Sequence, residues 1–420
     1  SVRKIDEQII TSSRLGLILK NDAAFGKNWR LANAMRRKVD EQWKPVWGTD
    51  SLVENNYNEL VLELTNSEGH KMNIHFRVYD DGVGFRYEIP EQETLDSLII
   101  TDELTEFNVA TNGTAWSIPA NYESYEFLYS TSPVDSVESA NTPITIKCET
   151  GTYLSIHEAN LTNYAGMTLI NKGNKNFECD LVPWPDGDKV KTTTPMKSPW
   201  RTVMIADKAG DLISSHLIQN LNEPSQIQDV SWIEPMKYVG IWWGMHIGAE
   251  TWTLGPHHGA TTENMIRFID FAADRSIDAV LAEGWNTGWE RWGQAGAFDQ
   301  TTPYADYDFE YIAKYAKAKG VRLIGHHETG GDILTYEQRL DTAMRMLAAF
   351  DIHALKTGYA GPISNGYYHH SQRMVNHYRK VVEAAAKYQI MLDVHEPIKP
   401  TGTSRTWPNM MTREGVRGME

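Results

Sequence analysis

The pattern of apolar residues changes near residue 230, and this change restricts the possible folds more than any other feature. Before it, runs such as "NELVLELTN" and "KMNIHFRVYDDGVGFRYEI" alternate apolar with polar residues, and Asn, Asp and Gly separate the runs. The Asp-Gly pair in "YDDGVGF" is typical of a β-hairpin turn. Many short strands over roughly 200 residues predict a large β-sandwich.

After residue 230, strand-like and helix-like segments alternate. The strand-like runs are "YVGIWWGMHIG", "IDAVLAEGWN", "VRLIGHHETGG", "HALKTGYAG" and "IMLDVHEP". Buried strands separated by helices predict parallel βα units, most simply a (β/α)8 TIM barrel, with a doubly wound sheet as the alternative. Five clear strands and a sixth candidate in "NMMTREGVRGME" are too few for a full barrel. We therefore expect a multi-domain α/β chain whose barrel is truncated after about six strands.

The predicted domains are residues 1–230, the sandwich, and residues 231–420, the incomplete barrel. The formal net charge of −15 argues against a nucleic-acid-binding protein. The 14 Trp and 19 Tyr suit sugar binding, although core packing explains them equally simply. Cys148 and Cys179 are expected to be buried free thiols. No apolar run has transmembrane length, so we expect no membrane insertion.

Polar residues follow each predicted strand of the second half, at the barrel end where active sites form. These residues are His246, Glu283, Glu290, His326, His327, Glu328, Lys356, His395 and Glu396. Such a series indicates a catalytic face. Hydrolysis of a glycosidic bond needs two carboxyl groups, which Glu328, Glu396 and Glu420 could supply. A metal-dependent hydrolase of amides or phosphates is the alternative, but the dispersed histidines lack an HxH pattern after the first strand.

Several stretches together resemble glycoside hydrolase family 97, and specifically its inverting α-glucosidase/glucoamylase branch. They include "FRVYDDGVGFRYEIP", "IHEANLTNYAGM", "EGWNTGWE", "GHHETGG", "ALKTGYAG" and the closing "HEPIKPTGTSRTWPN…REGVRGME". The resemblance implies an N-terminal β-supersandwich, a catalytic (β/α)8 barrel and a small C-terminal β-domain. The start of the supersandwich, the last barrel strands and the third domain are expected to lie outside this sequence.

The family pattern also implies roles for individual residues. Glu420 would be the general acid, and Glu328 with Glu396 would hold the attacking water as the base. Glu158, Glu396 and Glu414 would bind a Ca²⁺ ion, for which hard oxygen ligands are suitable. Substrate would be bound by a set of polar side chains, namely His326, His327, Lys356, His395 and Glu290.

Retaining members of the family carry an Asp nucleophile where this sequence has Gly358, which favours inversion. The expected function is therefore an exo-acting, Ca²⁺-dependent α-glucoside hydrolase that releases glucose from maltooligosaccharides or starch. An α-galactosidase of the same family and a catalytically inactive carbohydrate-binding protein are the alternatives. The expected partner is an oligosaccharide, and the expected assembly is a monomer or homodimer. Relatives of this kind are usually exported, which implies a periplasmic location.

Overall fold

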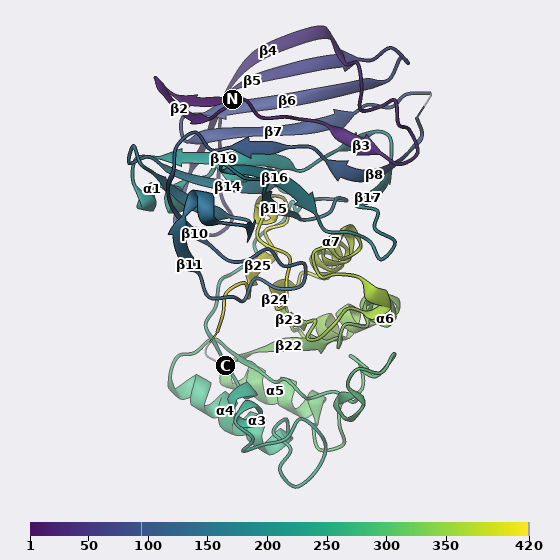
Figure 1. The fold of residues 1–420 in the computed structure, drawn as a ribbon. Helices are drawn as coiled ribbons and strands as arrows, with labels where there is room; N and C mark the ends of the chain where they lie inside the picture. The colour runs from purple at the N-terminus through teal and green to yellow at the C-terminus, as the bar shows by residue number, and fades with distance from the viewer. Residues whose placement is uncertain (94, 419–420) are drawn as a thin grey trace.

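The computed structural model describes residues 1–93 and 95–418, and it divides into two halves (Figure 1). The first half consists almost entirely of antiparallel strands, and the second half alternates parallel strands with helices. The multi-domain α/β class is therefore confirmed. In the described residues, no helix is both long enough and apolar enough to cross a membrane.

The first half is built around one large sheet. In spatial order its strands are β11 (Ser130–Pro133), β10 (Gly113–Ser117), β13 (Ile144–Cys148), β14 (Tyr153–Ala159), β19 (Trp200–Ala206), β7 (Gly82–Ile89), β6 (Lys71–Tyr79), β5 (Val53–Thr65) and β4 (Arg30–Trp43), with β18 (Met196–Lys197) paired to β7. Buried and exposed residues alternate at the start of β5, as the period-two pattern predicts.

Smaller sheets accompany the large one. A four-stranded sheet has the order β12 (Ser139–Asn141), β15 (Met167–Asn171), β16 (Asn176–Leu181) and β9 (Glu106–Asn108), and a three-stranded sheet the order β17 (Val190–Thr193), β8 (Ser97–Glu103) and β3 (Leu17–Leu19). Strands β1 (Val2–Lys4) and β2 (Glu7–Ile10) form a separate hairpin. Apolar side chains from these sheets, among them Phe107, Ile156 and Leu169, belong to one buried cluster. Cys148 and Cys179 are buried free thiols, as predicted.

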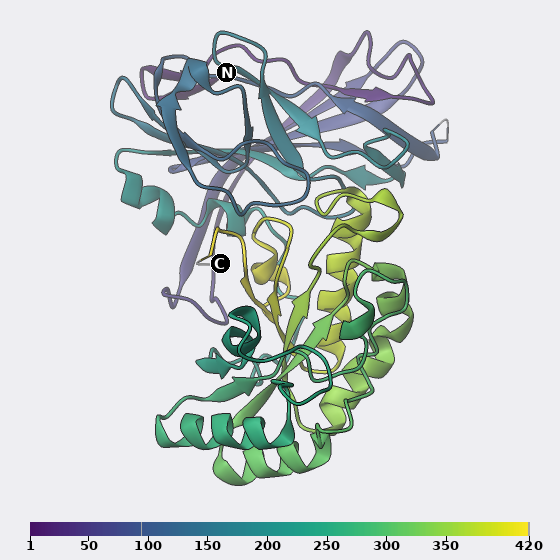
Figure 2. The same ribbon diagram turned by 60° about the horizontal axis from the view of Figure 1, so that its bottom comes forward.

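The second half contains one parallel sheet of six strands. Their order along the sheet is their order in the chain: β20 (Tyr238–Gly240), β21 (Ala279–Leu281), β22 (Arg322–Glu328), β23 (Ala354–Gly358), β24 (Met391–Val394) and β25 (Met410–Arg413). The main helices are α4 (Thr262–Asp274), α5 (Phe309–Lys319), α6 (Ile333–Ala349) and α7 (Gln372–Lys387). They lie along the outside of the curled sheet (Figure 2). The described strands thus form an open, curled sheet rather than a closed barrel.

The helices begin and end at residues that the sequence marks clearly. Asp308 accepts a hydrogen bond from the backbone of Tyr311 at the start of α5, and Gly320 ends that helix with a φ of 70°. Asp332 caps α6 in the same way. Short helices complete the chain: α1 (Ala209–Ser214), α2 (Leu217–Asn220), α3 (Trp242–His246) and α8 (Thr403–Thr406), with 3₁₀ turns η1 (Val134–Ser136), η2 (Trp289–Arg291) and η3 (Ser364–Gly366).

The first strand of the parallel sheet is shorter than predicted. The run "YVGIWWGMHIG" is extended only to Gly240, and Trp242–His246 forms helix α3 instead. The prediction that His246 follows a strand is therefore wrong. The ring of His246 stacks on Trp242, with 4.2 Å between the ring centroids, and this helical i, i+4 contact is unavailable in a strand.

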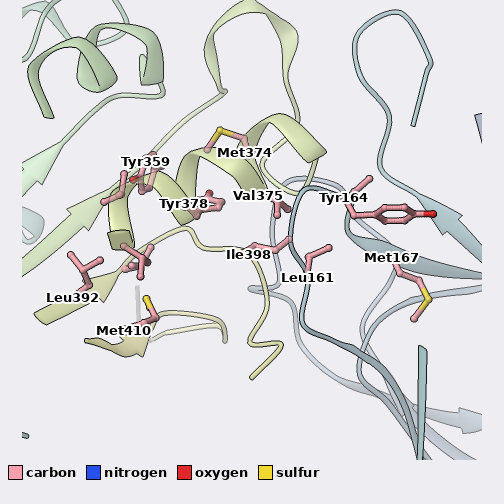
Figure 3. Close-up of a cluster of buried hydrophobic side chains, with 14 of the residues drawn as sticks. Leu161, Tyr164, Met167, Tyr359, Met374, Val375, Tyr378, Leu392, Ile398 and Met410 are labelled. Atoms are coloured by element: carbon pink, nitrogen blue, oxygen red, sulfur yellow. The ribbon is translucent and has the colours of Figure 1, made fainter. Parts of the chain in front are cut away.

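The two halves pack through an apolar interface. Figure 3 shows Ile398 and Val375 of the second half beside Leu161 of the first, and all three side chains border one small cavity. Backbone hydrogen bonds cross the same boundary, for example from Gly166 to the carbonyl of His370 at 3.0 Å. The parallel sheet is therefore held against the sandwich by buried contacts close to the carboxyl end of β24.

Candidate active site

A pocket of about 530 Å³ lies at the carboxyl ends of the parallel strands. This volume is within the range typical of small-molecule sites. Its walls are formed by Glu126, Trp242, Trp252, Glu283, Trp289, Trp292, His326, Glu328, Lys356, Gly358, Ala360, His395, Glu396 and Glu414. The prediction that strand ends converge on one polar site is therefore confirmed for β21 to β24, and Glu414, which follows β25, lines the same pocket.

A larger hollow of about 920 Å³ lies on the sandwich, where the β1–β2 hairpin faces strands β4 to β7. Of its acidic residues, Glu59 is bound by Arg37 and Arg77, and Asp207 is bound by Lys4. The smaller pocket at the strand ends brings five carboxyl groups together, and it is the better candidate for chemistry.

Strand β22 directs alternate side chains to opposite sides. His326 and Glu328 line the pocket, whereas His327 points away from it and accepts or donates a hydrogen bond at 2.9 Å with the hydroxyl of Tyr336 on α6. Burial lowers the pKa of His327 to about 3, so it is a neutral core residue. The assignment of His327 to substrate binding is therefore wrong, because successive strand residues face opposite ways.

Glu328 is almost completely buried at the floor of the pocket. Its Oε1 accepts hydrogen bonds from the backbone N–H groups of Thr329 at 2.9 Å and Gly330 at 2.7 Å. Burial and the neighbouring charge of Glu396 nevertheless raise the pKa of Glu328 to about 8. A buried carboxyl group whose pKa is raised by a neighbouring carboxylate is typical of acid–base sites.

Glu396 follows β24 and approaches the pocket from the adjacent strand end. Its Oε2 accepts a hydrogen bond of 2.8 Å from the backbone N–H of Tyr359, while its own carbonyl accepts one from the hydroxyl of Tyr378. Its pKa is raised, chiefly by burial. The backbone of Glu396 has a φ of +48°, a left-handed conformation that is rare for a residue other than Gly, Asn or Asp.

Gly358 ends β23 directly opposite Glu328, its partner in the strand register. A Cβ atom at position 358 would lie only 2.2 Å from Oε2 of Glu328. The absence of a side chain here therefore lets the Glu328 carboxylate occupy the space beside β23. An aspartate at this position would compete with Glu328 for the same volume.

Lys356 and Glu283 form an ion pair across the pocket floor, between β23 and the end of β21. The Nε2 atom of His326 lies 3.8 Å from the other oxygen of Glu283. Burial, followed by the charge of Lys356, holds the pKa of His326 well below its usual range, so the ring is neutral. The pocket therefore offers the ammonium group of Lys356, the neutral ring of His326 and the carboxylate of Glu283 on one side.

His395 bridges two acidic residues beside the pocket. Its Nδ1 lies 2.8 Å from Oε2 of Glu414, and its Nε2 lies 3.6 Å from Oδ2 of Asp393. Burial opposes protonation, but the hydrogen bonds to these carboxylates raise the pKa of His395 to about 9. The protonated ring of His395 therefore carries an N–H toward each carboxylate, one toward Glu414 and one toward Asp393.

Aromatic rings form the opposite wall, and the sequence did not assign them individually. Trp252 and Trp289 stack with 4.6 Å between their centroids and an interplanar angle of 8°. Trp292 lies against Trp289, and it keeps 44% of its surface exposed. Broad apolar faces next to carboxylates suit the mixed polar and apolar surface of a sugar ring.

Glu158 does not reach the pocket, contrary to its predicted role as a metal ligand. It lies on β14 and is completely buried, with Oε2 at 2.6 Å from Arg201 and Oε1 at 2.7 Å from Lys399. Burial alone would raise the pKa of Glu158, but Lys399 and Arg201 lower it to about 2. Both oxygens are thus engaged by cations of the protein.

The sandwich instead contributes Glu126 to the pocket. This residue lies in the loop 118–129 between β10 and β11. No pattern in the sequence indicated Glu126, because an acidic residue in a long loop is ordinary. Only the packing of the two halves places this loop near the parallel strand ends.

Two other predicted site residues keep their roles as predictions. Glu290 is exposed in η2, does not line the pocket and accepts a hydrogen bond from the hydroxyl of Tyr304, so its assignment to substrate binding stays a prediction. Glu420, the predicted general acid, lies outside the described residues. Its role stays a prediction.

A cation site is only partly organised. Among residues 1–93 and 95–418, no three His, Cys, Asp or Glu side chains are close enough to form a ready metal site. Glu396 and Glu414 nevertheless line the same pocket as Glu126, and carboxylate oxygens are the ligands that Ca²⁺ prefers. These three side chains fit the donor chemistry of calcium, whereas Glu158 lies outside the pocket with both oxygens bound by Arg201 and Lys399.

Comparison with known proteins assigns the family. Residues 1–224 match the family described as "Glycosyl-hydrolase 97 N-terminal", and residues 242–416 match "Glycoside hydrolase 97". The chain belongs to glycoside hydrolase family 97. The predicted family is therefore confirmed, and the pocket at the strand ends is the candidate active site of a family 97 chain.

Solved structures include a family 97 enzyme from Pseudoalteromonas sp. strain K8, in complexes with panose and with acarbose. It is 42% identical, with a TM-score of 0.94 over 98% of this family 97 chain and 65% of that chain. Curated relatives are a retaining alpha-galactosidase of Bacteroides thetaiotaomicron and a probable one of Streptomyces bingchenggensis, 25% and 26% identical over 98% of this chain. The chain spans 63% and 60% of the lengths of these two relatives.

Proposed function

We propose that this family 97 chain forms the active site of an exo-acting α-glucoside hydrolase that inverts the anomeric centre. The observation that carries the proposal is the pair Glu328 and Glu396 beside Gly358, a position with no side chain to act as a nucleophile. Inverting hydrolysis needs a carboxylate that activates water, and the pocket supplies two. The six parallel strands would be the first six of a (β/α)8 barrel.

The family 97 enzyme bound to panose and acarbose supports a glucoside substrate, since panose is built from α-linked glucose units. In this proposal Glu328 and Glu396 hold the attacking water and take its proton. Glu420 would donate a proton to the leaving oxygen. Lys356, His326 and His395 would bind hydroxyl groups, and the tryptophan wall would cover the apolar face of the ring.

An α-galactosidase is the second candidate, favoured by the names of the curated relatives. A binding protein without activity is the third. One assay separates them: p-nitrophenyl α-glucoside and α-galactoside are supplied side by side, and proton NMR follows the first sugar anomer formed. We expect glucose release with β-glucose appearing first. α-Galactose as the first product would favour the retaining candidate, and no hydrolysis of either substrate would contradict an enzyme.

Bound Ca²⁺ would neutralise the repulsion among the pocket carboxylates and favour their ionised forms. Glu396 and Glu414, with Glu126 in place of Glu158, would hold the ion. We expect EDTA to lower the hydrolysis rate and added Ca²⁺ to restore it, whereas Mg²⁺ should restore less, since it demands stricter octahedral geometry. A rate that is unaffected by EDTA, measured with calcium-free buffers, would contradict a calcium requirement.

A further inference from the structure

The segment that follows Glu396 is inserted into the sandwich. It runs from Pro397 to Gly402 between β24 and α8, and Lys399 is 3% exposed. Ile398 packs beside Leu161 at the interface of the two halves (Figure 3). The pocket residue Glu396 is therefore followed, three positions later, by a buried lysine whose side chain reaches into the sandwich.

Lys399 is fixed by three acceptors, all from the sandwich. Its Nζ lies 2.7 Å from Oε1 of Glu158, and it also donates to the hydroxyl of Thr142 and the carbonyl of Met167. Three acceptors satisfy the three protons of the ammonium group. This geometry leaves Lys399 no freedom to move without breaking a buried ion pair.

The charges around Lys399 are balanced. Arg201 pairs with Glu103 and with Glu158, each at 2.6 Å, and all of these side chains are completely buried. Two cations and two carboxylates give the cluster no net charge. Buried ion pairs are weak contributors to stability when compared with apolar packing, so their presence calls for another explanation, such as a fixed geometry.

Neutral hydrogen bonds fix the next two residues. His157 Nε2 lies 2.8 Å from the carbonyl of Pro400. The carbonyl of Thr401 accepts from the backbone N–H of Asn160 and from the side chain of Asn222, both at 2.8 Å. The sandwich thus contacts three consecutive residues of this segment.

Glu396 itself is in a conformation that needs external support. Its φ of +48° is strained for such a residue, and strained residues persist only when their surroundings determine them. On its N-terminal side, Glu396 follows β24, which is held in the parallel sheet; on its C-terminal side, the sandwich holds Lys399. The strained residue therefore lies between two fixed points, one in each domain.

We infer that Lys399 is a positioning residue that acts through the backbone: anchored by Glu158, it holds Glu396 in its left-handed conformation with the carboxylate in the pocket. The inference rests on the proposed function, which gives Glu396 its catalytic role. It assigns Glu158 to this anchor. It also gives the sandwich a task in catalysis that does not depend on any bound ion.

The test is the charge-balanced double variant Lys399→Met with Glu158→Gln, which leaves Arg201 paired to Glu103. We expect it to fold, to show a kcat about 10- to 100-fold lower and to keep its KM, because a small displacement of Glu396 affects the reaction more than binding. The matched control is Lys20→Met with Asp188→Asn, a pair within the sandwich whose ion pair measures 2.8 Å. The control should keep the kcat of the wild type.

If the double variant does not fold, a second variant tests whether the segment after Glu396 positions its carboxylate. His157→Leu removes one neutral hydrogen bond to Pro400, a loss small enough to permit folding. We expect kcat to fall severalfold at unchanged KM, and His157→Gln, which retains a donor, to recover part of the loss. Folded variants with the kcat of the wild type would overturn the inference. An inactive wild type would instead overturn the proposed function.

Discussion

Replacing Glu328 with Gln is expected to lower kcat by about 10²–10⁴-fold, the contribution typical of a general base. Glutamine has nearly the shape of glutamate, so the contacts with Thr329 and Gly358 change little. The amide cannot accept the proton of an attacking water. The measurement is steady-state hydrolysis of an α-glucoside, with circular dichroism and thermal melting to show that the variant is folded.

Glu310→Gln provides the matched control for this result. Glu310 is exposed on α5, where it pairs with Lys314, four residues along the helix. The same chemical change there should leave kcat and KM unaltered. If Glu328→Gln and Glu310→Gln were equally active, Glu328 would have no part in proton transfer.

Replacing Arg201 with Met is expected to destabilise the protein by about 3–5 kcal/mol, the usual cost of breaking a buried ion pair from one side. Methionine has a similar length but leaves Glu103 without its charged donor, and leaves Glu158 with Lys399 and the backbone N–H of Met167. The measurement is the urea dependence of unfolding at neutral pH. Arg37→Met is the control, because Arg37 is 59% exposed and its pair with Glu59 should contribute less than about 1 kcal/mol.

The pH dependence of the stability of Arg201→Met shows whether the loss comes from an unpaired buried charge or from lost packing. In the variant, the pKa of a buried carboxyl without its cation rises above the value for the unfolded chain, so the deficit is full at neutral pH and shrinks as the pH falls. In the wild type, the pKa of Glu158 is about 2, and its contribution is lost as the pH falls from about 4.5 towards that value. A deficit independent of pH would indicate packing alone.

Local patterns predicted the parallel sheet well. The strand ends of β22, β23 and β24 were located from short apolar runs followed by His326, Lys356 and Glu396, and all three residues line the pocket. Periodicity is decided by neighbouring residues, so it can be read from the sequence alone. The direction of each side chain in β22 could also have been predicted from the sequence. His327 lies between two residues that face the pocket, and side chains alternate between the two faces of a strand.

Contacts between distant segments could not be predicted in this way. Glu158 lies in a strand whose sequence does not reveal the distant Lys399 as its partner. Glu126 lies in a loop that reaches the pocket only because the halves pack together. The helix at Trp242–His246 was missed for a related reason: a short apolar run fits either a strand or a helix, and tertiary packing selects between them.

The loop that carries Glu126 has a consequence for how the protein is made. Residue 126 leaves the ribosome long before residue 396, and domains generally fold as units during synthesis, the N-terminal one first. The sandwich, with its buried Arg201 cluster already assembled, would then act as a template on which the later segment is shaped. The pocket at the strand ends would therefore form only when the second half of the chain folds against the sandwich.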